Sequence, residues 1–477
     1  RHVGGDRVET AQASPEAVAR WLTEQRWFAR PVSEPGADGS DEPAVPFDVS
    51  LSEPLPLSDA PRVGLVLATT ADGHRYQLLL PTGGKPRRAG PTDGAEVVDV
   101  ADGADAAKAL ARLSVDEAGQ TGPFGTVQGH WMPGVAPPGR RVPRGLGADQ
   151  TNTSTVVGGT HVLKVLRRLA AGPHPEVEVG RHLHEQAAAT GTPLPIAPLA
   201  GWYELVEPTG ERTTLGVLHR LVPGALDGWG LVLSALAAAP GTLLTRLHHL
   251  GADLARLHGA LARPGHDGGS GGGFGAEPVT AAYLAATARA TVTAVADLEA
   301  TVGHHLVTRV DQTLGALVAD LGGTDAGVAI RTHGDLHLGQ TVVGPDGWVI
   351  LDFEGEPART IEERRRHHPA LRDVAGLLRS LSYAAETVRR AGGDRLTDGW
   401  EPAARAALLD GYLATVDPSL VPASAAATVS LLSLFEVEKA VCEISYELAH
   451  RPDWVHLPVT GLARVVHRLD RHGAVER

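Results

Sequence analysis

The sequence is short of cysteine, of positive charge and of long apolar runs. Cys442 is the single cysteine among 477 residues, so the chain cannot form an internal disulfide and is expected in the cytoplasm. The apolar run Leu231 to Leu244 contains Pro240 and Gly241 and is too short to span a bilayer. A formal net charge of -13 disfavours a nucleic-acid partner, although it does not exclude a nucleotide bound locally with a metal ion. We therefore expect neither a membrane nor a nucleic acid as a partner.

The length and composition predict a folded chain of two or three compact units. Hydrophobic residues make up 43% and charged residues 21% of the sequence, as in globular proteins. In the first half, residues 64–80 and 155–166 are apolar stretches interrupted by turn signals, which predict two hairpins. The second half is mostly helical in composition, with helical stretches at 242–262, 279–320, 370–391, 401–415 and 424–450. Together the two halves predict an α+β fold.

The most informative segment has two acidic centres on either side of one predicted hairpin. The first lies in the sequence H-G-D-L-H-L-G-Q, residues 333–340, and the second in D-F-E-G-E-P, residues 352–357. The turn at residues 344–347 can fold the chain back so that the Asp335 and Asp352 carboxylates emerge at the same end. Phosphoryl transfer needs one carboxylate to orient the attacking hydroxyl and another to hold Mg²⁺ on the triphosphate. We assign Asp335 to the first role and Asp352 to the second.

Two further side chains can complete the metal site. Gln340 follows Asp335 at the spacing at which the kinase catalytic loop places its metal-binding Asn. Glu354 would share a face with Asp352 if strand geometry continues, as a second metal ligand or as a contact to the acceptor. The sequence contains no H-E-x-x-H motif or Cys/His cluster that would support zinc.

Together these motifs resemble the maltokinase branch of the aminoglycoside-phosphotransferase-like kinases, and in particular its glucosamine kinase offshoot. Further matches are Gln25 to Phe28, Asp149 to Ser154 and Leu371 to Gly376, so the resemblance spans most of the chain. It implies a bilobal protein-kinase-like fold with ATP and Mg²⁺ as cofactors. The implied parts are a cap with the start of the N-lobe at 1–135, an ATP-binding N-lobe at 136–224 and a helical C-lobe with the sugar site at 225–477.

The nucleotide is expected to bind the N-lobe without a glycine-rich loop. Lys164 lies in the second strand of the predicted hairpin, where a kinase fold needs a cation on the triphosphate. Glu178 is the expected partner that orients this lysine, and Glu176 is its rival. The polar turn before the hairpin must then contact the phosphates; its residues are Gln150, Thr151, Asn152, Thr153 and Ser154.

Two more roles follow from the resemblance. Adenine would lie near His219 and Leu221, held by backbone polar groups. Asp373, at the start of a predicted helix, would support the backbone of the catalytic loop rather than take part in the chemistry.

We infer the acceptor from the last long helical stretch, residues 424–450. Glu436, Glu443 and Glu447 share one helix face, which is either a solvated stripe partly neutralised by Lys439 or part of a sugar site. The resemblance places this helix beside the acceptor, and the acceptor contacts it implies are Asp335, His337, Glu354, Cys442, Glu443, Tyr446 and Glu447.

Cys442 bears on the choice of sugar, because relatives that phosphorylate maltose tend to carry Tyr at this position. Without that ring a disaccharide loses an aromatic platform, and nearby carboxylates favour an acceptor with an ammonium group. We therefore expect glucosamine, phosphorylated on its 6-hydroxyl. The alternatives are a maltokinase that makes maltose 1-phosphate, an aminoglycoside phosphotransferase, and a non-catalytic kinase-like binding protein.

Overall fold

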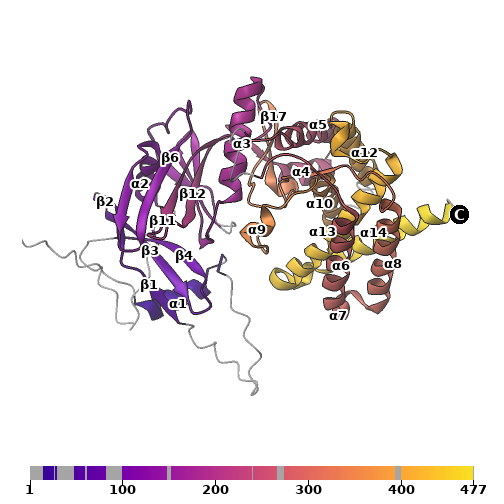
Figure 1. Ribbon diagram of the computed structural model, residues 1–477, viewed down its shortest axis with the longest axis horizontal. Helices are drawn as coiled ribbons and strands as arrows, with labels where there is room; N and C mark the ends of the chain where they lie inside the picture. Colours follow the sequence, from indigo (N-terminus) through magenta and orange to yellow (C-terminus); the bar gives the residue numbers. More distant parts are fainter. Residues whose placement is uncertain are drawn as a thin grey trace, which may run out of the picture. The chain divides into compact units, whose positions relative to one another are not determined.

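The chain forms two compact units in the computed structural model (Figure 1). Unit 1 comprises Arg1–Val177 and Ala197–Val222, and unit 2 comprises Glu178–Ile196 and Pro223–Arg477. The structure describes residues 14–25, 27–28, 48–59, 62–81, 99–101, 103–147, 152–238, 240–265, 273–392 and 399–475.

A five-stranded antiparallel sheet forms the first part of unit 1. Its strands, with the helix that covers it, are β1 (Val49–Leu51), β2 (Leu55–Asp59), β3 (Arg62–Thr70), β4 (Arg75–Pro81), β10 (Arg168–Leu169) and α1 (Pro15–Thr23). β3 and β4 are the predicted hairpin, with Ala68 opposite Tyr76. Val18 and Leu22 of α1 are buried in one cluster with Phe28 and Tyr76, so the amphipathic α1 covers an apolar face of the sheet.

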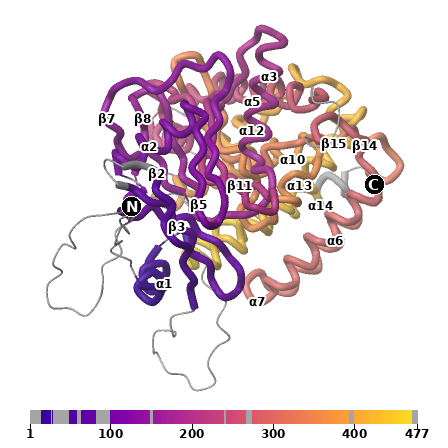
Figure 2. Tube along the Cα trace, turned by 60° about the vertical axis from the view of Figure 1, so that its left-hand side comes forward, coloured from indigo at the N-terminus to yellow at the C-terminus, as the bar shows by residue number. Residues whose placement is uncertain are grey.

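A seven-stranded antiparallel sheet forms the rest of unit 1, in the order β5-β6-β11-β12-β9-β8-β7. Its strands are β5 (Gly119–Gly122), β6 (Gly125–Trp131), β7 (Arg141–Gly145), β8 (Thr153–Gly158), β9 (His161–Val165), β11 (Leu199–Val206) and β12 (Arg212–Arg220), and α2 (Ala104–Val115) packs on it (Figure 2). β8 and β9 are the second predicted hairpin. The turn between them has Gly158 and Gly159 at φ of 63° and 75°, a conformation that favours glycine.

Unit 2 is mainly helical. Its helices are α4 (Gly228–Ala238), α5 (Leu243–Leu261), α6 (Ala281–Asp297), α7 (Glu299–Val302), α8 (His304–Leu321), α9 (Ile361–Arg364), α10 (Leu371–Arg390), α12 (Trp400–Leu413), α13 (Ala425–His450) and α14 (His456–Val475), while α3 (Pro175–Thr190) begins in unit 1 and continues in unit 2. The expected helix at 279–320 is divided into α6, α7 and α8, with Gly303 at φ 84° before α8. The sequence analysis did not predict α2, α4, α9 or α14.

Two small three-stranded sheets complete unit 2. One consists of β13 (Leu226–Asp227), β16 (Thr341–Gly344) and β17 (Gly347–Ile350), and the other of β14 (Glu277–Pro278), β15 (Val328–Ile330) and β18 (His368–Pro369). β16 and β17 pair from Thr341 opposite Ile350 to Gly344 opposite Gly347. The hairpin predicted between the two acidic motifs is therefore present.

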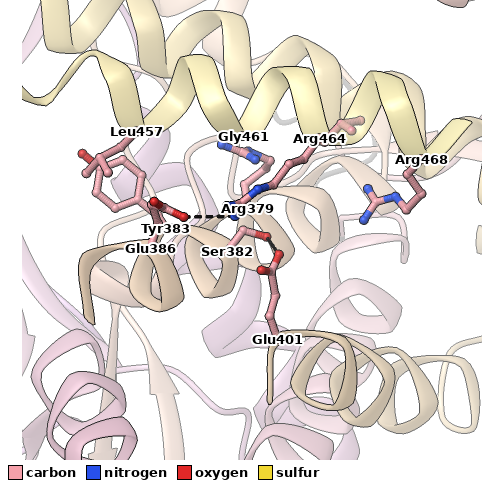
Figure 3. Close-up of a pocket in the computed structure, with 10 residues that line it drawn as sticks. Arg379, Ser382, Tyr383, Glu386, Glu401, Leu457, Gly461, Arg464 and Arg468 are labelled. Carbon is pink, nitrogen blue, oxygen red and sulfur yellow. Dashed lines mark hydrogen bonds and ion pairs between the residues drawn. The ribbon is translucent and has the colours of Figure 1, made fainter. Parts of the chain in front are cut away.

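Helix α10 lies in the large hydrophobic core of unit 2 and packs against α12, α13 and α14. Its side chains Leu377 and Leu381 are fully buried. Where α10 meets α14, the Arg379 guanidinium occupies the space beside Gly461 (Figure 3), and a Cβ at position 461 would lie 2.5 Å from Arg379 Nη2. In the described part of the chain, no helix is both long and apolar enough to cross a membrane.

Candidate active site

The segment that carries Asp335 connects β15 to the 3₁₀ turn η2 (Leu338–Gln340). His333 Nε2 donates to the Leu351 carbonyl at 2.7 Å, and the Leu351 amide donates to the Gln340 carbonyl at 2.9 Å. These two bonds tie both ends of the H-G-D-x-x-x-x-Q segment to the residue before Asp352. The two acidic motifs are therefore held side by side in unit 2.

Asp373, in the first turn of α10, holds the backbone of this segment. Its carboxylate accepts hydrogen bonds from the His333 amide at 2.7 Å and the Gly334 amide at 3.0 Å. His258 Nε2 lies 3.2 Å from the same carboxylate, and His258 Nδ1 lies 2.9 Å from the Tyr412 hydroxyl. Burial raises the pKa of Asp373, but the bond and charge of His258 outweigh it and bring the pKa to about 2. The carboxylate therefore stays ionised, and His258 and Tyr412 are supports that the sequence analysis missed.

Asp335 is paired with a lysine that the sequence analysis had assigned elsewhere. Lys439 of α13 places its Nζ 2.6 Å from Asp335 Oδ1 and 3.5 Å from Glu356 Oε2. Burial raises the pKa of Asp335, but Lys439 and then His337 lower it more, so the net pKa lies below its usual value. Lys439 thus faces the segment that carries Asp335 and not the glutamates of its own helix.

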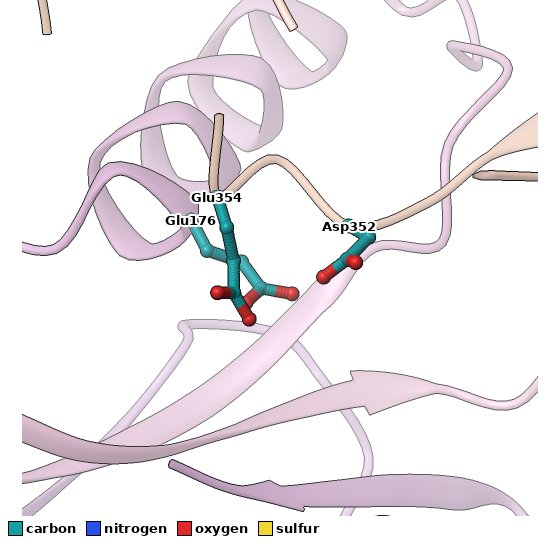
Figure 4. Close-up of side chains that lie close together, drawn as sticks. All are labelled: Glu176, Asp352 and Glu354. Carbon is teal, nitrogen blue, oxygen red and sulfur yellow. The ribbon is translucent and has the colours of Figure 1, made fainter. Parts of the chain in front are cut away.

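Asp352 and Glu354 follow β17 and point their carboxylates toward one another (Figure 4). One carboxylate oxygen of each residue lies within 4.8 Å of the other. Asp352 has φ 67°, and its carbonyl accepts from the Glu354 amide at 2.8 Å. The expectation of continued strand geometry is therefore wrong, because β17 ends at Ile350 and a turn, with Asp352 in the left-handed region, brings the carboxylates together. Two such oxygen donors suit a hard cation such as Mg²⁺.

Lys164 lies on β9 and pairs with Glu176 at the start of α3. The Nζ of Lys164 is 3.1 Å from Glu176 Oε2, and His219 Nε2 is 2.9 Å from Glu176 Oε1. Burial raises the pKa of Glu176, but the charges of Lys164 and His219 hold it well below its usual range. The preferred partner, Glu178, was wrong, because residues two positions apart on a helix point in nearly opposite directions and only Glu176 faces β9.

Glu178 makes different contacts, all within unit 2. Its carboxylate accepts from Arg365 at 2.7 and 2.8 Å and from Arg331 at 3.3 and 3.4 Å. Arg331 is 1% exposed and follows β15, two residues before His333. Glu178 therefore helps to fix the strand that leads into the segment with Asp335. The sequence analysis missed both arginines, which are far from Glu178 in the chain.

The turn expected to bind phosphate is described only in part. Gln150 and Thr151 lie outside the described residues. Asn152 Oδ1 accepts from the Arg167 amide at 3.2 Å, and Thr153 Oγ1 accepts from Arg167 Nε at 2.8 Å. These side chains thus bind Arg167, which also forms a buried ion pair with Asp99.

Three other residues were expected to contact the nucleotide: Ser154, His219 and Leu221. Ser154 is buried on β8. The Leu221 amide donates to the Thr160 carbonyl at 2.9 Å, in addition to the contact of His219 with Glu176.

The acidic face of α13 is largely paired with cations. Glu436 binds Arg405 and Arg468, one with each carboxylate oxygen, and Glu443 accepts from Arg379 at 2.6 Å. The stripe is therefore neither solvated nor neutralised by Lys439, because arginines from α10, α12 and α14 reach it. Arginine is suited to such buried pairs because it stays charged.

Glu447 differs from the other two glutamates. Its Oε1 accepts from the Tyr383 hydroxyl at 2.9 Å and from Arg451 at 2.6 Å. Its Oε2 is buried and has no hydrogen-bond partner among the described residues.

Two other expected acceptor contacts on α13 are Cys442 and Tyr446. Burial raises the pKa of the Cys442 thiol to about 11, while Tyr446 is 53% exposed. Cys442 is therefore a neutral thiol at neutral pH.

The chain has an α+β, protein-kinase-like fold, as the sequence motifs predicted. A solved glucosamine kinase in complex with glucosamine, ADP and inorganic phosphate superposes with a TM-score of 0.61 at 24% identity, covering 89% of this chain and 95% of that chain. No family model matches the chain.

Two curated sequences carry the comparison further. The chain is similar to a glucosamine kinase from Streptacidiphilus jiangxiensis, 28% identical over 438 residues that cover 89% of this chain and 93% of the relative. It is also similar to a glucosamine kinase from Mycolicibacterium smegmatis, 27% identical over 437 residues, with 87% and 96% covered. The predicted resemblance to the glucosamine kinase branch is confirmed.

Proposed function

We propose that this chain is an ATP- and Mg²⁺-dependent sugar kinase that phosphorylates glucosamine to glucosamine 6-phosphate. The observation that carries the proposal is the ionised Asp335 on a loop whose backbone is fixed by Asp373, beside the carboxylate pair of Asp352 and Glu354. Similarity to two glucosamine kinases over almost their whole lengths supports both the reaction and the acceptor. Because ATP is the phosphoryl donor, we place the enzyme in the cytoplasm.

Asp335 acts on the acceptor hydroxyl in this proposal. The hydroxyl oxygen forms a bond to the γ-phosphorus, the bond from that phosphorus to the bridging oxygen of ADP breaks, and the hydroxyl proton passes to Asp335. Asp352 and Glu354, with Gln340, would hold the Mg²⁺ that neutralises charge on the phosphates. Lys164, kept in place by Glu176, would bind the triphosphate.

Glu447 is the best of the predicted contacts for the amino group of the sugar. Its buried Oε2 has no partner in the described part of the chain, whereas Glu443 already binds the Arg379 guanidinium. A buried carboxylate oxygen without a donor favours a ligand that supplies one. An ammonium group supplies both the donor and the opposite charge.

The test is kcat/KM for glucosamine, glucose, N-acetylglucosamine and maltose under the same ATP and Mg²⁺ conditions. We expect glucosamine to exceed glucose by about tenfold or more, the worth of one charge-assisted hydrogen bond. N-acetylglucosamine is expected to be poorer still, because acetylation removes the charge and adds bulk. A preference for maltose would identify a maltokinase, and an absence of ATP consumption with all sugars would identify a non-catalytic protein.

A further inference from the structure

Lys439 lies in the middle of α13, and its surroundings keep it in one place. The residues after it, Ala440 and Val441, are 0% and 2% exposed in the core of unit 2. The side chain itself is 22% exposed and ends between Asp335 and Glu356. The backbone that carries Lys439 is therefore fixed by packing, and the side chain reaches from it to the two carboxylates.

The contact with Asp335 uses one of its two carboxylate oxygens. Lys439 Nζ is 2.6 Å from Oδ1, while Oδ2 has no hydrogen-bond partner among the described residues. A single ammonium therefore fixes the rotation of the carboxylate and leaves a defined oxygen available.

Glu356 provides the second half of the arrangement. It lies 3.5 Å from Lys439 Nζ and comes from the turn that follows Asp352 and Glu354. Burial lowers the pKa of Lys439, but Asp335 and Glu356 raise it more, so the lysine remains an ammonium. The charge that faces Asp335 is thus present throughout the neutral range.

We propose that Lys439 is a positioning residue for phosphoryl transfer, whose ammonium holds Oδ1 of Asp335 so that Oδ2 is presented to the acceptor hydroxyl. The inference rests on the proposed kinase function but not on the identity of the sugar, because it acts through Asp335 alone. A correctly oriented Asp335 raises kcat mainly because it holds the acceptor hydroxyl in line for attack on the γ-phosphorus.

The decisive comparison is Lys439→Met against Lys439→Arg, with kcat and KM measured separately. Lys439→Met is expected to lower kcat by about a hundredfold while KM for ATP changes by about twofold or less. Lys439→Arg retains a cation and is expected to recover about tenfold of that loss. Arg405→Met is the matched control, because it removes another cation that pairs with a glutamate of α13, and its kcat should stay within about twofold of wild type.

A pH profile separates positioning from loss of stability. Without the ammonium, the pKa of Asp335 should rise, so the acidic limb of kcat is expected to move to higher pH in Lys439→Met. The charged and titratable groups that face this pair are His333 and His337 beside Asp335, and Glu356 and Cys442 beside Lys439. In Lys439→Arg the acidic limb of the kcat profile should stay at nearly the same pH as in wild type.

Three outcomes overturn the inference: kcat of Lys439→Met within about twofold of wild type, an unmoved acidic limb, or no recovery with arginine. If Lys439→Met does not fold, Glu356→Gln replaces it, and an unchanged kcat in that folded variant counts against the inference. A failure of the proposed function can be told apart from a failure of this inference, because the wild-type protein would then show no sugar-dependent ATP turnover. If wild type acts on glucose or maltose instead, the same variants are measured with that sugar and the same losses are expected.

Discussion

Glu438 and Lys439 are consecutive residues of α13, yet they belong to two kinds of ionic contact. Both carboxylate oxygens of Glu438 are occupied, by Arg359 at 3.1 Å and by Arg372 at 3.0 Å twice. Lys439 instead binds a single oxygen of Asp335. The first contact closes a carboxylate to any further ligand, and the second leaves it open.

The same difference distinguishes other carboxylates of unit 2. Glu436, with both oxygens bound by arginine, has no capacity for a ligand. Asp335 and Glu447 each retain one oxygen without a partner among the described residues. A buried acceptor without a partner, such as Glu447 Oε2, is unfavourable in a purely structural role. The Asp335 side chain is 17% exposed, so its open oxygen can be reached by a ligand. We therefore expect substrate groups at these two oxygens.

The largest expected effect comes from removing the open carboxylate at the catalytic segment. Asp335→Ala should lower kcat by about a thousandfold or more, with little change in KM for ATP, because the acceptor hydroxyl loses the group that orients it. Steady-state kinetics with glucosamine measures the change. In Glu436→Gln, where both oxygens serve arginines, kcat should stay within about twofold of wild type. Near-normal turnover of Asp335→Ala would show that the open oxygen of Asp335 does not serve the acceptor hydroxyl.

A smaller effect is expected at Glu447. Replacing Glu447 with Gln keeps the size of the side chain but removes the charge, so the preference for glucosamine over glucose should fall by about tenfold. Glu443→Gln is the matched control on the same helix, because Glu443 already binds Arg379, and its effect on the preference should be smaller. The readout is the ratio of kcat/KM for the two sugars. An equal loss in both variants would assign the amino group to neither residue.

Much of this architecture could be predicted from local sequence. The hairpins β3–β4, β8–β9 and β16–β17 follow from apolar runs separated by turn residues, and the motif around Asp335 indicates both the reaction and the family. These features depend on residues that are close together in the chain. Spacing along one segment is sufficient to read them.

The partners of the charged residues could not be predicted in this way. Lys439 is 104 positions from Asp335, and Arg365 is 187 positions from Glu178. Helix periodicity offered the glutamates of its own helix as partners of Lys439, and the sequence analysis preferred Glu178 over Glu176 as the partner of Lys164. These pairs are decided by tertiary packing, as where arginines of α10, α12 and α14 reach the glutamates of α13.

The smallest expected effect tests the closed carboxylate of Glu438 through stability. Burial raises its pKa, but Arg372 lowers it more strongly, to about 2 in the folded protein against an ordinary value of 4.5. A depressed folded-state pKa stabilises the protein above the unfolded-state pKa, and this stabilisation is lost as the pH falls from about 4.5 to about 2. It amounts to about 3 kcal/mol at neutral pH. Glu438→Gln should therefore lower the free energy of unfolding at pH 7. It should also weaken the pH dependence of that free energy below about pH 5, and denaturant titrations from pH 7 to pH 3 measure both effects. If wild type and variant keep the same difference in stability from pH 7 to pH 3, the charge of Glu438 is not what stabilises this pair.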